Sequence, residues 1–156
     1  MEGISDKARN CAFCDIISGK SPALRVFEDD TVIAFLDRSP VFKGHTLFMP
    51  KKHYTNLYAI EERALKKFFS GLKFVAKGVE LGTESDGTLI IENNNVSQSV
   101  PHLHFHIVPR KFSDGLRGFL WPRVKYRNED EAEAIAKNIT SQIELLLHGH
   151  RKHAVI

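Results

Sequence analysis

Residues 101–109 read Pro-His-Leu-His-Phe-His-Ile-Val-Pro, and this stretch decides how the rest of the sequence is interpreted. Successive side chains of a β-strand point to opposite faces. A strand over 103–108 therefore places His102, His104 and His106 on one face and three apolar side chains on the other. The apolar face predicts a contribution to the core. Three imidazoles in strict alternation, out of 8 histidines in the chain, indicate a functional face.

Three aligned imidazoles are suited to two kinds of chemistry. They can bind one metal ion, because histidine is the commonest metal ligand. They can instead divide nucleophilic work, with one neutral imidazole attacking while its neighbours donate protons or positive charge. An uncharged nitrogen nucleophile suits a phosphorus centre that is shielded by anionic oxygens, and flanking donors stabilise the charge that develops. Spacing alone leaves both possibilities open.

The segments around this strand predict an α+β fold with a mainly antiparallel sheet of about five strands and two helices. Apolar residues recur at helical spacing from Leu65 to Val79 and again from Ala132 to Leu147. Short β-rich runs bounded by turn residues indicate the strands. The expected elements are strands at 26–27 and 31–36 forming a hairpin, a strand at 44–49, a helix at 60–80, strands at 87–91 and 103–108, and a helix at 129–147.

Composition describes an ordinary globular chain. Its 156 residues, 42% hydrophobic and 26% charged, suit one compact domain. We expect a flexible tail at 1–10, a single domain at 11–148 and a second tail at 149–156. A net charge of +3 is too small to predict a specific nucleic-acid partner. No apolar run reaches the roughly 18–20 residues of a membrane span, and the N-terminus has no secretory apolar core, so we expect a cytoplasmic protein.

Cys11 and Cys14 form a C-x-x-C pair. Such a pair binds metal, carries out redox chemistry or consists of unremarkable thiols. A thioredoxin-type motif follows a strand, and none is predicted before Cys11. Two ligands do not close a zinc site, so a metal would need two more ligands from elsewhere in the chain.

The pattern His-φ-His-φ-His-φ-φ, where φ is apolar, is met in full by residues 102–108, and in this the chain resembles the histidine-triad (HIT) family. The likeness covers residues 11–110 and indicates a zinc-containing, bacterial-type member, with features of both the Hint and the Fhit branches. It implies a HIT-like fold. Further segments that match the family in order are 11–17, 27–30, 34–37, 44–47, 50–53 and 98–100.

The resemblance implies a covalent two-step reaction. His104 is similar to the family's nucleophile, which forms a nucleotidyl-histidine that water then hydrolyses. His106 and His45 resemble residues that orient the nucleophile and contact phosphate. Gln98 and Ser99 resemble the pair near the phosphate and the leaving group, where an amide and a hydroxyl donate hydrogen bonds.

The resemblance also implies a nucleotide-binding set. Asp37 resembles the side chain that holds the ribose hydroxyls, although by itself an Asp there also suits a cap on the turn that follows. Asn93 is expected to contact ribose or phosphate. The remaining members, around the base, the sugar or the phosphate, are Phe13, Ile16, Leu36, Arg38, Gln98, Ser99, His104 and His106.

The chain departs from the family pattern in two ways. The family usually has glycine immediately before the glutamine, and this chain has Ser97 there. A backbone with positive φ is harder to form with serine than with glycine. The loop 93–97 is also about two residues shorter than in common members.

Some family members carry a structural zinc, and the resemblance assigns its ligands here to Cys11, Cys14, His53 and His102. Together they make a closed Cys₂His₂ set suited to tetrahedral zinc. A closed site has no open position for a catalytic water. The zinc is therefore expected to be structural, and the chemistry itself to need no metal.

The expected activity is hydrolysis or transfer at the α-phosphate of purine nucleotides, for example of nucleoside phosphoramidates such as AMP-amines. The alternatives are a diadenosine polyphosphate hydrolase and a nucleotide-binding regulatory protein with incidental hydrolysis. The resemblance also implies a homodimer. The leaving group, the base preference and the branch are not fixed by the sequence.

A basic segment follows the triad. It suits a solvated face, or contact with distal phosphates or an acidic leaving group. Trp121 suits either stacking on a base or packing at a subunit interface. The basic residues are Arg110, Lys111, Arg117, Arg123, Lys125 and Arg127.

Overall fold

The computed structural model describes residues 11–116 and 125–153. Its five strands and two long helices confirm the predicted order of elements, and two short helices are additional. The predicted tail at 1–10 lies outside the described residues, and the last helix extends beyond its predicted end at 147. The elements are α2 (Ala12–Ile17), β1 (Arg25–Glu28), β2 (Val32–Leu36), β3 (Thr46–Pro50), the 3₁₀ helix η1 (Leu57–Ala59), α3 (Glu62–Gly82), β4 (Gly87–Glu92), β5 (Phe105–Arg110) and α5 (Glu129–His153).

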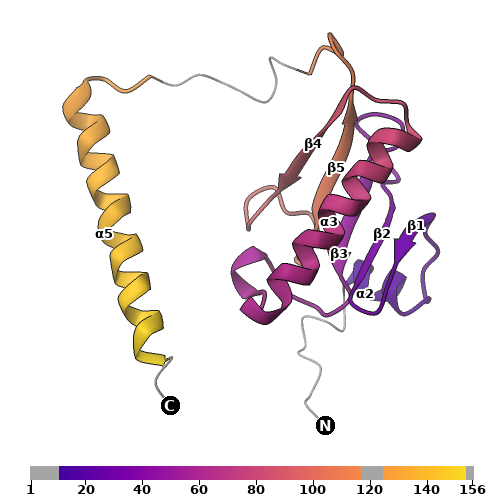
Figure 1. Ribbon diagram of the computed structural model, residues 1–156, viewed down its shortest axis with the longest axis horizontal. Coiled ribbons are helices and arrows are strands. Elements are labelled where there is room, and N and C mark those ends of the chain that lie inside the picture. The colour runs from indigo at the N-terminus through magenta and orange to yellow at the C-terminus, as the bar shows by residue number, and fades with distance from the viewer. Residues whose placement is uncertain (1–10, 117–124, 154–156) are drawn as a thin grey trace. The chain divides into compact units, whose positions relative to one another are not determined.

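The five strands form one antiparallel sheet in the order β1-β2-β3-β5-β4 (Figure 1). This confirms the prediction of an α+β fold with an antiparallel sheet of five strands. The β1–β2 turn is closed by Asp29, whose Oδ1 accepts the backbone N–H groups of Thr31 and Val32 at 2.6 and 2.8 Å. Strand β5 pairs with both β3 and β4, so Leu47 of β3 and Ile91 of β4 flank His106.

Both faces of the central sheet are covered. Helix α3 packs on one face, where Phe48, Ile107 and Leu103 are fully buried among its apolar side chains. Helix α2 packs on the other face, against Ile33 and Met49. A strand covered on both faces is apolar at every position. This explains why β2 and β3 read as continuous apolar runs instead of alternating ones.

Strand β5 begins at Phe105, so His106 lies in the strand, whereas His102 and His104 precede it. The backbone leaves the sheet because its hydrogen bonds go elsewhere: the Leu103 N–H donates to the Tyr54 carbonyl at 2.6 Å. The apolar side chains still enter the core, as the alternation predicted. The histidines are brought together by a loop and a strand, not by one strand face.

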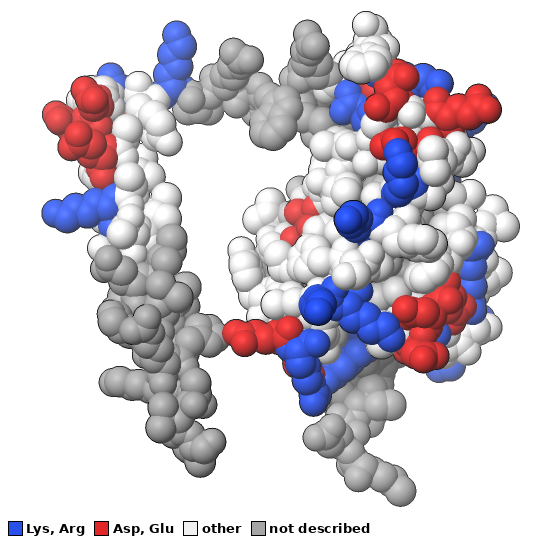
Figure 2. Space-filling model, viewed as in Figure 1, with Lys and Arg blue, Asp and Glu red and all other residues white. Residues whose placement is uncertain are grey.

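The chain divides into two compact units, residues 1–114 and 115–156. The described part of the second unit is mainly α5, whose first turn is acidic and whose Ile135 and Ile139 are exposed. On the face of the first unit in Figure 2, basic and acidic side chains are intermixed. Among the described residues, no helix is long and apolar enough to cross a membrane.

Candidate active site

A cavity of about 780 Å³ opens between α2, the segment before β1 and the triad. Its wall is mostly apolar, with a few polar groups converging on it, which is the usual character of a small-molecule site. Phe35, Leu47, Val100 and the segment 21–24 complete the wall. The predicted site residues that line it are Phe13, Ile16, Leu36, Asp37, Arg38, Ser99, His104 and His106.

His104 is held in one tautomer. Its Nδ1 lies 2.6 Å from the His102 carbonyl oxygen, which only accepts, so Nδ1 carries the proton and donates it. Nε2 therefore carries a lone pair. Burial lowers the pKa of His104 and favours the neutral ring. A neutral imidazole with a free Nε2 on a cavity wall can act as a nucleophile.

A second pair of imidazoles is ordered by a backbone group. The Val41 N–H donates to His45 Nδ1 at 3.2 Å, so the proton of His45 is on Nε2. That Nε2 lies 2.9 Å from Nδ1 of His106 and donates to it. His106 must then carry its own proton on Nε2. Because burial lowers the pKa of both rings, to about 4 for His106, this pair is a neutral donor relay.

The position of Asp37 is compatible with both of its interpretations. Its Oδ1 accepts the Ser39 N–H at 2.8 Å, which is the cap on the following turn. The residue also lines the cavity. Its Oδ2 lies 3.7 Å from His45 Nδ1, but that nitrogen already accepts the Val41 N–H. The contact is therefore one between two acceptors as long as His45 is neutral.

Gln98 and Asn93 do not line the cavity in this structure. The Gln98 amide donates to the Thr55 carbonyl at 2.6 Å, and its Oε1 accepts the Asn95 N–H at 3.3 Å. The side chain is therefore used to hold the loop that leads to Ser99. Ser97 has φ +60, so this position takes the left-handed backbone in which the family usually places glycine.

The four predicted metal ligands, Cys11, Cys14, His53 and His102, come together, with their ligand atoms within 4.8 Å of one another. His102 Nδ1 lies 3.5 Å from the Cys11 sulfur and 3.6 Å from the Cys14 sulfur, and His53 Nδ1 lies 3.3 Å from the Cys14 sulfur. A tetrahedral zinc with ordinary bond lengths separates such atoms by about 3.6 Å. The donor set and its spacing therefore fit zinc.

The surroundings of the cluster favour metal binding. His102 Nε2 donates to the Pro50 carbonyl at 2.8 Å, which leaves Nδ1 as the lone pair toward both sulfurs. Burial, and then the neighbouring Cys11, raise the pKa of the Cys14 thiol to about 12. A divalent cation between the sulfurs would offset that cost, since it stabilises thiolates.

Asp37, His45 and His106 also lie close enough to be considered as metal ligands. Their facing atoms are already engaged: His45 bonds to His106 through one ring nitrogen and to the Val41 N–H through the other. We therefore interpret this group as a hydrogen-bonded relay.

Three of the four described residues of the basic segment make structural pairs, and the fourth, Lys125, is exposed. Arg110 pairs with Asp114, Lys111 donates to the Glu84 carbonyl, and Arg127 pairs with Glu131. None of these three cations lines the cavity. The other predicted contributors Arg117, Trp121 and Arg123 lie outside the described residues.

Some parts of the site were not predicted from sequence. Phe35 could have been found, because the period of β2 places it on the same face as Ile33. Leu47 becomes part of the wall only through its register opposite His106. The backbone N–H of Val41 sets the tautomers of two imidazoles, and no side-chain pattern reveals such a role.

Comparison with known proteins identifies the family to which this chain belongs. Residues 18–113 match the HIT domain family. A HIT protein of Bacillus subtilis is 38% identical over 138 residues, covering 87% of this chain and 93% of its own length. An adenosine 5′-monophosphoramidase of Schizosaccharomyces pombe is 31% identical, covering 86% and 99%. An adenylylsulfatase of Arabidopsis thaliana is 36% identical, covering 69% of this chain and 55% of its own length.

Solved structures give the same picture. A Streptococcus mutans protein has a TM-score of 0.77 at 34% identity, covering 92% of this chain and 89% of its own. A zinc-bound histidine-triad protein of Mycobacterium smegmatis has a TM-score of 0.65 at 30% identity, covering 86% and 99%.

Proposed function

The chain belongs to the HIT family, and we propose that it hydrolyses purine-nucleotide conjugates at the α-phosphate through a nucleotidyl-His104 intermediate. The observation that carries this proposal is the fixed tautomer of His104, with Nδ1 donating to the His102 carbonyl and Nε2 bearing a lone pair. Two relatives support it by their names, an adenosine 5′-monophosphoramidase and an adenylylsulfatase.

In the first step, Nε2 of His104 forms a bond to phosphorus while the bond from phosphorus to the leaving group breaks. The positive charge that develops on the ring is stabilised by the His102 carbonyl at Nδ1. The Nε2–H of His106, at the end of the relay from Val41, donates to a phosphate oxygen. Ser99 relays a proton to the departing amine, giving up its own hydroxyl proton as it accepts one from solvent water, so that it remains a hydroxyl. The Asp37 carboxylate accepts hydrogen bonds from the ribose hydroxyls, and the base lies between the apolar walls of the cavity.

In the second step, water attacks the phosphorus and loses its proton to solvent. His104 leaves as the neutral imidazole it was at the start, so no further acid is needed. The products are the free amine and the nucleoside monophosphate.

The charges around the cavity favour a substrate with a single phosphorus. Among the described residues that line it, Arg38 is the one Lys or Arg, and its guanidinium donates to the Pro22 carbonyl at 3.1 Å. A polyphosphate chain would need further cations. The charges of the described lining residues therefore favour a nucleoside phosphoramidate over a diadenosine polyphosphate as the substrate.

The metal cluster would hold a structural zinc through Cys11, Cys14, His53 and His102. When bound, zinc supplies cross-linking of the N-terminal segment to the triad segment, and no step of the reaction passes through it. Elemental analysis of protein purified without chelator should give about one zinc per chain. Preparations without zinc in which both thiols react freely would contradict this assignment.

His104→Asn tests the reaction itself. It should lower turnover of an AMP-amine by at least about a thousandfold, roughly 4 kcal/mol of transition-state stabilisation, and leave AMP binding intact. A panel of AMP-amines and diadenosine polyphosphates then separates the two hydrolase activities. Tight AMP binding with negligible turnover of every substrate would instead favour the nucleotide-binding regulatory protein.

A further inference from the structure

Helix α2 takes part in two sites at once. Cys11, at its N-cap, and Cys14 face the metal cluster, while Phe13 and Ile16 line the cavity. We infer that α2 couples the metal cluster to the reaction site, with Phe13 as a positioning residue for His104. This inference rests on the proposed function, because it assigns the group that holds the proposed nucleophile in place.

The Phe13 ring contacts both a predicted metal ligand and the proposed nucleophile. Its ring centroid is 5.0 Å from that of His104, with 79° between the planes, and 6.1 Å from that of His102, at 70°. The Phe13 ring also makes an edge contact with the ring of Phe35 in β2, with 5.8 Å between the centroids, and this contact packs it against the sheet. Edge-to-face pairs of this kind add orientation to simple burial.

His104 depends on such a contact. The hydrogen bond from Nδ1 to the His102 carbonyl fixes one end of its ring. Phe13, only 8% exposed, and His106, whose ring centroid is 5.0 Å away, occupy other sides. If the Phe13 ring withdraws, the imidazole gains room to turn, and Nε2 loses its fixed direction into the cavity.

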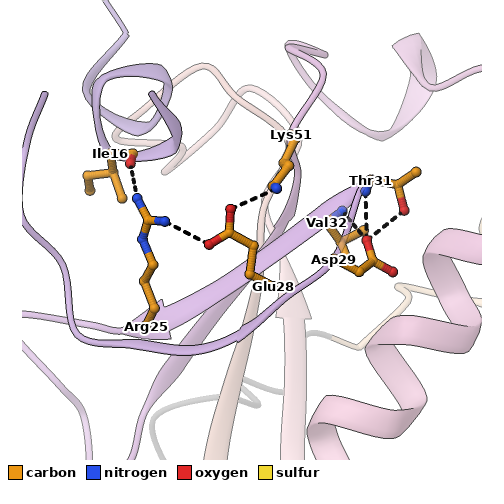
Figure 3. A network of polar contacts seen from close by, with 7 residues as sticks. All are labelled: Ile16, Arg25, Glu28, Asp29, Thr31, Val32 and Lys51. Carbon is orange, nitrogen blue, oxygen red and sulfur yellow. Dashed lines mark hydrogen bonds and ion pairs between the residues drawn. The ribbon is translucent and has the colours of Figure 1, made fainter. Parts of the chain in front are cut away.

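Helix α2 is too short to hold Phe13 by itself. A helix of six residues has no independent stability in water. It is anchored at its C-terminal end by Arg25, whose Nη2 donates to the Ile16 carbonyl at 2.9 Å (Figure 3). Glu28 bridges Arg25 to Lys51, with both contacts at 2.7 Å. These ion pairs are part-exposed, and such pairs contribute little.

The stronger anchor is at the N-terminal end. Cys11 is 2% exposed, and both thiols contact the imidazole of the fully buried His102. His102 is two residues from His104, and its carbonyl accepts the hydrogen bond that His104 Nδ1–H donates. Filling the cluster with zinc would therefore fix α2 and the nucleophile's hydrogen-bond acceptor together.

A simpler interpretation is that Phe13 forms only part of the base wall. That role predicts a higher KM with an unchanged rate at saturation. Positioning predicts a lower rate of nucleotidyl-enzyme formation at saturating substrate, because a small displacement of a reacting atom costs up to about a hundredfold. The two interpretations therefore separate in single-turnover kinetics.

The test compares two variants of the full chain, Phe13→Leu and, as a control on the same helix, Ile16→Val. In preparations whose zinc content and melting temperature match those of the native protein, Phe13→Leu should slow single-turnover nucleotidyl transfer from an AMP-amine by about 10- to 100-fold. Ile16→Val should change KM alone. The ¹⁵N shifts of His104 should show a fixed Nδ1–H tautomer in the native protein and a mixture in Phe13→Leu. Unchanged rate and unchanged tautomer in Phe13→Leu would overturn the inference.

Metal removal provides the second arm. Protein stripped with chelator, and shown to be folded by circular dichroism, should reproduce the tautomer mixture of Phe13→Leu, and added Zn²⁺ should restore the single form. An identical His104 spectrum with and without zinc would refute the coupling. The tautomer does not depend on turnover, so a chain inactive on every substrate would contradict the proposed function while the spectra still decide this inference.

Discussion

At the scale of single residues, the protonation of His106 links the site to stability. Burial, and then the neighbouring His104 and His45, lower the pKa of His106 to about 4, while an unfolded histidine titrates near 6.5. Between these values the unfolded state binds a proton that the folded state does not. The free energy of unfolding should therefore fall as the pH falls from about 6.5 to about 4, and be independent of this group above that window.

Urea unfolding of the native chain and of His106→Gln at pH 7 and pH 4.5 measures this effect. Between pH 7 and pH 4.5, the variant should lose about 1–2 kcal/mol less unfolding free energy than the native chain. This figure is reduced for the partial exposure of the ring. Comparing the two chains at each pH cancels the titration of the metal ligands. Equal losses in both chains would show that His106 titrates normally.

The left-handed backbone conformation of Ser97 should cost the folded protein stability. A non-glycine residue in the left-handed region costs about 1 kcal/mol, and Ser97 has φ +60. Ser97→Gly should therefore raise the free energy of unfolding by up to about 1 kcal/mol, less the extra freedom of glycine in the unfolded chain. Asn95→Gly, at φ +68, is the control and should gain less, because asparagine tolerates this conformation. A loss of stability in Ser97→Gly would mean that its side chain is needed there.

At the scale of elements, Arg25→Ala tests the C-terminal anchor of α2. Losing the bond to the Ile16 carbonyl should loosen the apolar wall of the cavity and raise the Kd for AMP a few-fold. The zinc content should not change, because the cluster lies at the other end of the helix. Isothermal titration with AMP measures the first quantity and elemental analysis the second. A loss of zinc would show that the two ends are not independent.

The elements that sequence predicted are those with a local signal. Both the helical spacing of apolar residues and a short β-rich run are local signals, so α3 and α5 were found from the first and β2 from the second. The departure of His102 and His104 from β5 was not predictable in this way, since it depends on the Tyr54 carbonyl accepting the Leu103 N–H. The same holds for Gln98, which is held by the Thr55 carbonyl. Contacts between distant backbone groups have no signature in the order of residues.

At the scale of the whole molecule, the extent of the domain and its assembly stay predictions. Both apolar clusters and all four metal ligands lie within residues 11–108. A chain ending at Asp114 should therefore fold and bind about one zinc, as measured by circular dichroism and elemental analysis. Failure to fold would show that α5 belongs to the same cooperative unit, as a single domain at 11–148 requires.

A homodimer is the second prediction at this scale. Sedimentation equilibrium should give about 35 kDa, twice the 17.7 kDa of one chain. A mass near that of a single chain over the micromolar range would exclude a stable dimer.

The position of β5 between β3 and β4 has a consequence for how the chain acquires activity. Strands β1–β3 form one meander of neighbours in sequence, and β4–β5 form a separate hairpin. The relay between His45 and His106, 61 residues apart, exists only where these two pieces meet. Closing so long a loop costs entropy before any contact offsets it. During refolding, we expect secondary structure to appear before AMP-amine turnover. The reaction needs the relay between His45 and His106, which forms only after β3 has paired with β5.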